Sequence, residues 1–413
     1  MKPLFEEAPD GRVEPTFKHL EQWDSGPATL PSALVQPYQL RIEFTGSGSE
    51  YFRIWVVNLL LLIVTVGIYY PWAKVRRLRY FHGNTLVDGE PMGFHGKPLK
   101  MLKGYFLVGL LFALYSVAGN FSPVAGLVAF VIVTAIWPAL LKSSMQFRLA
   151  NTSWRGMRFR FSGSMAGAYR SVIPMFVPSL IILVAIVFVV DPQKPPVWYL
   201  KVVGVVTLLG LALVPWLMYN LKRYQHDNYG VATLRTSFRA SVNSFYEVFG
   251  KLFGVTILPM ILSLTIAGAA VAVGFAARKS GALTPSNMKF FIGLGIALFV
   301  VSFMATFVVI KPWFTTRLQN LIWSGTHNHA LRFFSDLRFK SMLWLTVKNW
   351  LLIMLTLGLY WPFAAIAMAR MRLHAVRLEL QQSPDELLNL AHSAEGEAAG
   401  DAAGDLFGLD IGF

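Results

Sequence analysis

Histidine pairs are the first residues in this chain whose type and spacing could support metal chemistry. His327 and His329, in the stretch THNHA, stand two residues apart and could ligate one ion from an extended segment. No Asp, Glu or third His stands at a familiar ligand spacing, and the HExxH arrangement is absent. The chain also has no cysteine. We therefore expect structural or interfacial histidines, with no metal and no cofactor.

Recurring serines offer a second candidate chemistry, that of a nucleophile or a phosphate cradle. Ser47, Ser164 and Ser241 are each the last residue of a tetrad that begins with Phe, namely FTGS at 44, FSGS at 161 and FRAS at 238, but no GxSxG context surrounds them. Gly46-Ser47-Gly48 lacks the Lys-Ser or Lys-Thr of a P-loop. Helix N-capping explains these serines better. With no acid/base constellation, the sequence predicts that the protein is not an enzyme.

Basic residues beside aromatic ones are the third candidate, and they indicate anionic lipid headgroups as ligands. The residues with this pattern are Lys74, Arg76, Arg77, Arg79, Lys222 and Arg223. A general attraction to an acidic membrane surface is favoured over a specific lipid site. The net charge of +15 does not indicate nucleic acid, because membrane proteins collect Lys and Arg on their cytoplasmic side.

The composition is that of a multi-pass helical membrane protein. Hydrophobic residues make up 55% of the chain and charged residues 14%, against about 25% charged in a typical soluble domain. Mean hydropathy is +0.51. Apolar runs lie at about 54–73, 105–121, 123–141, 173–190, 198–219, 252–275, 290–310 and 348–369. The sequence predicts an all-α fold with 6–8 hydrophobic helices, and none of the runs has a charged residue near its middle.

An internal pseudo-repeat organises these helices. Each unit has a proline near the end of an apolar run, an asparagine thirteen positions later, and a phenylalanine ten positions after that. The repeated positions are Pro71, Asn84 and Phe94; Pro138, Asn151 and Phe161; Pro215, Asn228 and Phe238. Pro312 and Pro362 begin further partial copies.

Short hairpins follow the asparagines. NTLVDGEPMGF and NTSWRGMRFRF each place a glycine after a charged residue within an alternating pattern, which predicts a β-hairpin. Because the units repeat, we expect the hairpins to share one small sheet on the cytoplasmic side of the membrane.

Charge in the loops sets the expected topology. The loops 71–105, 138–172, 220–251 and 311–348 hold seven, six, five and six basic residues, and the intervening loops hold three or fewer. The rich loops are predicted to be cytoplasmic. If the first run crossed the membrane, the tetrad at 44–47 would lie opposite its repeats. Six spans plus two re-entrant segments, with both termini cytoplasmic, is therefore favoured over eight spans with both termini outside.

Three regions follow from the shifts in composition. Residues 1–38 form a polar, proline-bearing N-terminal tail that is expected to be mobile and not a signal peptide. Residues 39–381 form the membrane domain. Residues 382–413 form an acidic tail without Lys or Arg, and a solvated linker is the favoured interpretation. The alternative is that its apolar end at Leu406, Phe407, Leu409 and Ile411 docks on the cytoplasmic face of the protein itself.

The run TVGIYYPWAKVRRLRYFHGNT, followed by GFHGKPLKMLKG, resembles the signature of the bacterial YjgN family, a domain of unknown function. The end DLFGLDIGF is similar to the C-terminus of that family. The resemblance covers roughly residues 38–413 and implies a multi-pass protein of the bacterial inner membrane. It supplies no reaction, ligand or catalytic residue.

Two function classes remain. A transporter or channel for a small solute or lipid is favoured by the internal repeat, and the absence of intramembrane charge argues against it. The alternative is a non-transporting scaffold or regulator acting through its cytoplasmic hairpins and acidic tail. A continuous polar cavity between the helices would favour transport.

Overall fold

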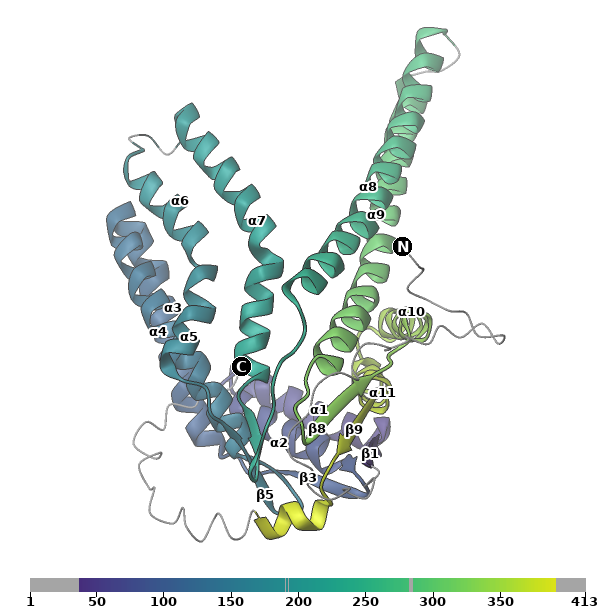
Figure 1. The fold of residues 1–413 in the computed structure, drawn as a ribbon. Helices are drawn as coiled ribbons and strands as arrows, with labels where there is room; N and C mark the ends of the chain where they lie inside the picture. Colours follow the sequence, from purple (N-terminus) through teal and green to yellow (C-terminus); the bar gives the residue numbers. More distant parts are fainter. Residues whose placement is uncertain (1–36, 190, 192, 282–284, 391–413) are drawn as a thin grey trace, which may run out of the picture. The chain divides into compact units, whose positions relative to one another are not determined.

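The computed structural model describes residues 37–189, 191, 193–281 and 285–390 (Figure 1). The tail at 1–36, which was expected to be mobile, and the apolar end at 406–411, for which docking was the alternative, lie outside these residues. The described chain is mostly helical, in line with the sequence. The all-α class is wrong, however, because nine strands form one continuous antiparallel sheet.

The helices come in five consecutive pairs. They are α1 (Gly48–Val64) and α2 (Tyr70–Gly83); α3 (Pro98–Phe121) and α4 (Pro123–Ala150); α5 (Met165–Val172) with α6 (Val177–Val187), and α7 (Val197–His226); α8 (Val242–Lys279) and α9 (Pro285–Ser324); α10 (Phe339–Leu355) and α11 (Trp361–His374). Each pair contacts the next, and α11 also contacts α1. The pairs therefore follow one another around a closed circuit.

The strands lie between the helix pairs. They are β1 (Tyr38–Phe44), β2 (Thr85–Val87), β3 (Glu90–Phe94), β4 (Thr152–Trp154), β5 (Met157–Phe161), β6 (Tyr229–Val231), β7 (Leu234–Arg235), β8 (Leu331–Ser335) and β9 (Val376–Leu380). Their order in the sheet is β7-β6-β5-β4-β3-β2-β1-β9-β8. The predicted hairpins are present as β2–β3 and β4–β5, and they share one sheet. We call these nine strands the ring, because its two ends also meet.

One hydrogen bond recurs in all five units and ties the start of each helix pair to its end. The second residue of each tetrad donates its backbone N–H to the carbonyl thirteen positions after the repeat proline. The five bonds run from Thr45 to Asn84, His95 to Asn151, Ser162 to Asn228, Arg239 to Gly325 and Asp336 to Ala375, with N···O distances between 2.7 and 3.0 Å. Every helix pair therefore leaves the ring and returns to it.

The repeated asparagines close the helices that return to the ring. Asn84, Asn151 and Asn228 each donate a side-chain N–H to the carbonyl four residues earlier, at 2.9, 2.8 and 2.6 Å. The backbone N–H groups of Asn84 and Asn151 also donate to these carbonyls, those of Tyr80 and Phe147, at 3.1 and 3.0 Å. At the other end, the side chains of Ser47, Ser164 and Ser241 accept from the first helical turn, which confirms their capping role.

The tetrad phenylalanines explain why glycine follows them. A Cβ on Gly46 would lie 2.7 Å from the ring of Phe44, and a Cβ on Gly163 would lie 2.6 Å from the ring of Phe161. The residue seven positions after the start of each tetrad lies in the first turns of the following helix and is no more than 2% exposed. These residues are Tyr51, Met101, Ala168, Phe245 and Met342. The repeat prolines Pro71, Pro138 and Pro312 are also fully buried.

The helix pairs differ in length. Among the described residues, five helices are long and apolar enough to cross a bilayer, or six spans if the bent pair α5–α6 counts as one broken span. All of them belong to the three middle pairs. The first and fifth pairs are short, with helices of 17 and 14 residues. Both turn through a residue pair with positive φ, Val66-Gly67 and Leu357-Gly358. Val66 is 88% exposed and Leu357 95%.

An apolar cluster with members from all five units lies at the ring. Its buried members are Leu40, Val87, Trp154, Met157, Ala232, Leu331, Leu380 and Leu387. Leu387 comes from a short helix at 384–390 that follows the ring. This helix begins in a capping box, because Ser383 and Glu386 exchange side-chain and backbone hydrogen bonds. Arg155, in the β4–β5 turn, pairs with Asp385 at 2.9 Å and so holds the helix there.

Candidate functional site

The two ends of the sheet meet at one seam, between β7 and β8. Isolated bridges join Phe238 to Thr326 and His327 to Arg332, and they stand where a tenth strand would complete the ring. The backbone N–H of His327 donates to the carbonyl of Ser237 at 2.9 Å. The seam is therefore closed by a few hydrogen bonds where the other junctions have full strand pairs.

Buried polar groups hold the inner side of the seam. The hydroxyl of Thr326, which is 0% exposed, lies 2.9 Å from Nδ1 of His226 and 2.7 Å from the carbonyl of Ile322. His226 is 5% exposed, and aromatic rings of Tyr229, Phe238 and Trp323 surround it. These contacts identify His226 as a structural residue.

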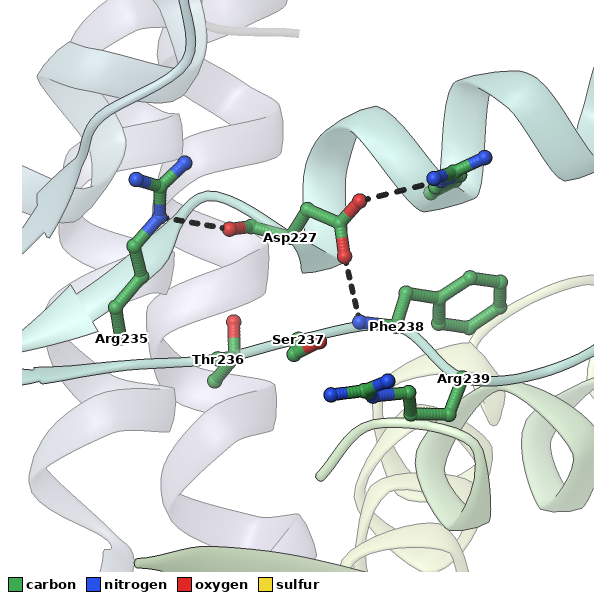
Figure 2. Close-up of a pocket in the computed structure, with 7 residues that line it drawn as sticks. Asp227, Arg235, Thr236, Ser237, Phe238 and Arg239 are labelled. Carbon is green, nitrogen blue, oxygen red and sulfur yellow. Dashed lines mark hydrogen bonds and ion pairs between the residues drawn. The ribbon is translucent and has the colours of Figure 1, made fainter. Parts of the chain in front are cut away.

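A pocket of about 520 Å³ opens beside the seam. Its lining residues are Arg223, Asp227, Arg235, Thr236, Ser237, Phe238 and Arg239. Figure 2 shows the Asp227 carboxylate at the end of α7 reaching the backbone nitrogen of Phe238, a contact of 2.6 Å. Arg223 pairs with the same carboxylate at 3.4 Å. Asp227 therefore fixes the Phe238 backbone and one wall of the pocket.

The pocket carries an excess of positive charge, since three arginines line it and one aspartate. Nε of Arg235 donates to the backbone carbonyl of Asp227 at 3.0 Å. Arg239 forms no ion pair within the described part of the chain. Burial, with Arg332 and Arg239 nearby, lowers the pKa of His327, so this histidine adds no charge at neutral pH. Guanidinium groups suit phosphate and carboxylate groups, and the pocket is therefore a candidate anion site.

The basic residues expected from the sequence do not converge on one site. Lys74 donates to the hydroxyl of Tyr105 at 2.7 Å. The guanidinium of Arg77 lies over the rings of Phe81 and Trp361. Arg79 reaches the carbonyl of Gly96 at 3.4 Å. These residues and Arg76 lie on α2.

The second basic group lies on α7, and the structure brings only one of its members to the pocket. Lys222 donates to the side chain of Gln225 at 3.0 Å. Arg223 lines the pocket. Arg235 and Arg239 were missed because they stand apart in the sequence, one in a hairpin and one in a tetrad. The alignment of the repeats could have identified Arg239, because it occupies the tetrad position that holds Thr45, His95 and Ser162 in other units.

Among the described residues, no group of three or more His, Asp or Glu side chains could hold a metal ion. His327 and His329 accordingly have no further ligand near them in that part of the chain.

Curated relatives of the chain are inner membrane proteins. The chain is 25% identical over 343 residues to the inner membrane protein YjgN of Salmonella typhimurium, an alignment that covers 79% of this chain and 85% of the relative. It is 31% identical over 156 residues to the inner membrane protein YjgN of Escherichia coli strain K12, covering 37% of this chain and 38% of the relative. No solved structure matches the chain.

A family comparison covers nearly the whole described chain. The match extends over residues 39–406 and so includes the ring and all five helix pairs. The protein therefore belongs to the family described as "Bacterial protein of unknown function (DUF898)", which agrees with the expected YjgN resemblance.

Proposed function

We propose that this protein is a non-transporting scaffold or regulator of the bacterial inner membrane. In this proposal six spans and two re-entrant hairpins hold the ring at the cytoplasmic surface. There the ring binds anionic phospholipid headgroups through the pocket at its seam. The observation that carries the proposal is the apolar cluster at the ring, to which all five units contribute.

The arrangement of spans is supported by the return of each helix pair to the ring. A pair whose two ends are joined by one backbone hydrogen bond crosses the bilayer an even number of times. The long middle pairs cross twice. Helix α1, at 17 residues, is about 25 Å long, and part of that length lies beside the ring. The short pairs therefore enter and return, with their exposed apolar turns at Val66 and Leu357 in lipid.

The orientation is supported by charge. The four loops rich in Lys and Arg lie at the ring ends of the helices, whereas the described residues at the far ends of α6, α7, α8 and α9 include fewer basic side chains. Cytoplasmic loops carry the excess of basic residues. The ring accordingly belongs on the cytoplasmic side.

The scaffold is preferred to a channel or transporter because of what fills the ring. A water-filled path along the ring axis needs polar lining, and the cluster there consists of Leu, Val, Trp, Met and Ala side chains. Trp154, which is 5% exposed, donates its indole N–H to the carbonyl of Val87 at 3.0 Å. Leu387 adds a further buried side chain from the helix at 384–390.

Flux measurements on the full chain in proteoliposomes test the scaffold against the channel. We expect the efflux of potassium and of carboxyfluorescein to equal that of protein-free vesicles. Leu387→Ala is expected to leave both rates unchanged, because Leu387 is part of a core and not of a gate. Efflux that depends on the protein, and that rises further in Leu387→Ala, would establish a channel through the ring.

Melting temperatures in nanodiscs test the headgroup site. Phosphatidylglycerol in place of phosphatidylcholine is expected to raise the melting temperature of the wild type, and to raise that of Arg239→Gln less. Arg158→Gln is the matched control, because Arg158 is exposed on β5 and does not line the pocket. Equal shifts in all three proteins would show a general surface attraction without a specific site.

A further inference from the structure

A long groove runs along the contact between α8 and α9. Its volume is about 870 Å³. On α8 it is lined from Lys251 to Ile266 and on α9 from Ser302 to Arg317. Each of these stretches covers fifteen helical steps, or about 22 Å. The two helices lie side by side as they lead away from the ring (Figure 1).

The walls of the groove are apolar along most of this length. Val255, Leu258, Leu262 and Ile266 recur at helical spacing on one face of α8. Two of the three hydroxyls in the walls donate to carbonyls of their own helices. Ser263 donates to the carbonyl of Pro259 at 2.7 Å, and Thr306 to that of Ser302 at 2.9 Å. The groove therefore offers an occupant mainly apolar contact area along these walls.

Cations stand at one end only. Lys251 and Arg317 line the end of the groove nearest the ring, and Trp313 lies one turn further in. Glu247 forms an ion pair with Lys251, which leaves this end with one excess positive charge. An apolar groove of this length, with basic residues at one end, matches an amphiphile with one anionic headgroup and a long hydrocarbon chain.

We propose that this groove binds one acyl chain of an anionic membrane phospholipid, whose phosphate lies against Lys251 and Arg317. The proposal rests on α8 and α9 spanning the membrane. The hydrocarbon core of a bilayer is about 30 Å thick, so a groove of about 22 Å accommodates the chain of one leaflet together with its headgroup linkage. Trp313 then lies at the depth where tryptophan is enriched in membrane proteins.

Gly254 provides a position at which occupation of the groove by lipid can be tested by substitution. Gly254 lines the groove, and a Cβ built there meets no atom within 4 Å. The Cβ of Gly254→Phe therefore has room, and its aromatic ring is expected to occupy part of the groove. Gly268→Phe is the matched control, because Gly268 lies on the same helix with equally open space and does not line the groove.

The test is native mass spectrometry of the full chain, exchanged into mild detergent and titrated with phosphatidylglycerol or phosphatidylethanolamine. We expect the wild type and Gly268→Phe to retain one phosphatidylglycerol, and Gly254→Phe to lose about tenfold in occupancy by either lipid. The double variant Lys251→Gln/Arg317→Gln should retain lipid but lose about tenfold in its preference for the anionic one. Arg278→Gln/Lys279→Gln, at the far end of α8, should keep that preference.

Equal retention by Gly254→Phe and the wild type would overturn the groove as the binding site, and so would an equal loss in both glycine variants. An unchanged lipid preference in Lys251→Gln/Arg317→Gln would overturn the assignment of the phosphate position. If labelling confirmed the spans but the wild type retained neither lipid, the lipid-binding proposal would be refuted and the proposed arrangement of spans would stand. If labelling refuted the spans, the proposed arrangement and the lipid-binding proposal that rests on it would both be refuted.

Discussion

Phe44 and Thr85 lie opposite each other on adjacent antiparallel strands, although the whole helical hairpin α1–α2 separates them in sequence. The next residue, Thr45, donates its N–H to the carbonyl of Asn84 at 3.0 Å. A helix pair closed in this way cannot leave its two ends on opposite faces of a membrane. The same closure in the other four units makes the ring the common base of all the helices.

Leu387 is expected to be a major contributor to the stability of the ring. It is 1% exposed within the apolar cluster, so Leu387→Ala removes buried methyl groups and leaves a cavity. We expect a loss of about 2–5 kcal/mol, seen as a lower melting temperature in detergent. Leu390, on the same helix, is 40% exposed, and Leu390→Ala should cost less than about 0.5 kcal/mol. Equal effects would show that the helix is not held by Leu387.

We expect the aromatic side chain of Phe44 to require glycine at position 46 of the tetrad. A Cβ at position 46 would lie 2.7 Å from the phenyl group of Phe44, so Gly46→Ala forces that phenyl group to move. The expected cost is about 1–3 kcal/mol. Gly83→Ala is the matched control, because a Cβ there meets nothing within 4 Å and alanine favours the helix by about 1 kcal/mol. A Gly46→Ala protein as stable as the wild type would refute this packing.

Asn349 is buried without a hydrogen-bond partner among the described residues, at both Oδ1 and Nδ2. Asn58 occupies the equivalent position in the first helix pair, and its Oδ1 is also unpaired in that part of the chain. An apolar replacement removes this desolvation cost, and we expect Asn349→Leu to stabilise the protein by about 1 kcal/mol.

The contrast is Asn320, whose side chain bonds Leu337 twice and the hydroxyl of Ser335. Asn320→Leu should destabilise the protein, and melting curves of both variants measure the difference. A loss of stability in Asn349→Leu would mean that this amide has a partner that the described residues do not include.

His82 is expected to make the protein less stable in acid. Burial lowers its pKa, a hydrogen bond to the carbonyl of Leu78 opposes this, and Arg148 lowers it further. The unfolded chain therefore binds a proton more readily, so the free energy of unfolding falls as the pH drops through about 6.5. His82→Gln should flatten the pH dependence of melting below pH 7. His329→Gln, at an exposed position, should keep the wild-type slope.

The repeat in the sequence predicted much of the fold. The spacing of Pro71, Asn84 and Phe94 identified the unit, and glycine after Asp88 identified a hairpin, which has positive φ at both Asp88 and Gly89. These signals are local, because caps and tight turns need particular residues at particular positions. The fourth and fifth units match the repeat only in part. Gly325 and Ala375 stand at the asparagine position, and Ser335 replaces the phenylalanine at the start of the fifth unit.

The closed ring and the candidate pocket could not be predicted from the same signals. Strands of two to seven residues are too short to show a pattern that sets their partners. The pairing of Tyr38 with Leu380 joins the first and the last strand of the described chain, and no local pattern encodes a contact over that separation. Arg235 and Arg239 come together with Arg223 only because the seam brings α7, β7 and a tetrad to one place.

The most direct test of the account is the side of the membrane from which the ring can be labelled. The chain lacks cysteine, so single substitutions at exposed positions can be probed with an impermeant maleimide in intact and lysed cells. We expect Gln39→Cys and Asp88→Cys to react only after lysis, and Lys194→Cys and Ser280→Cys to react in intact cells. Reaction of Gln39→Cys in intact cells, with Asp88→Cys protected, would place β1 and β2 on opposite sides and contradict the account.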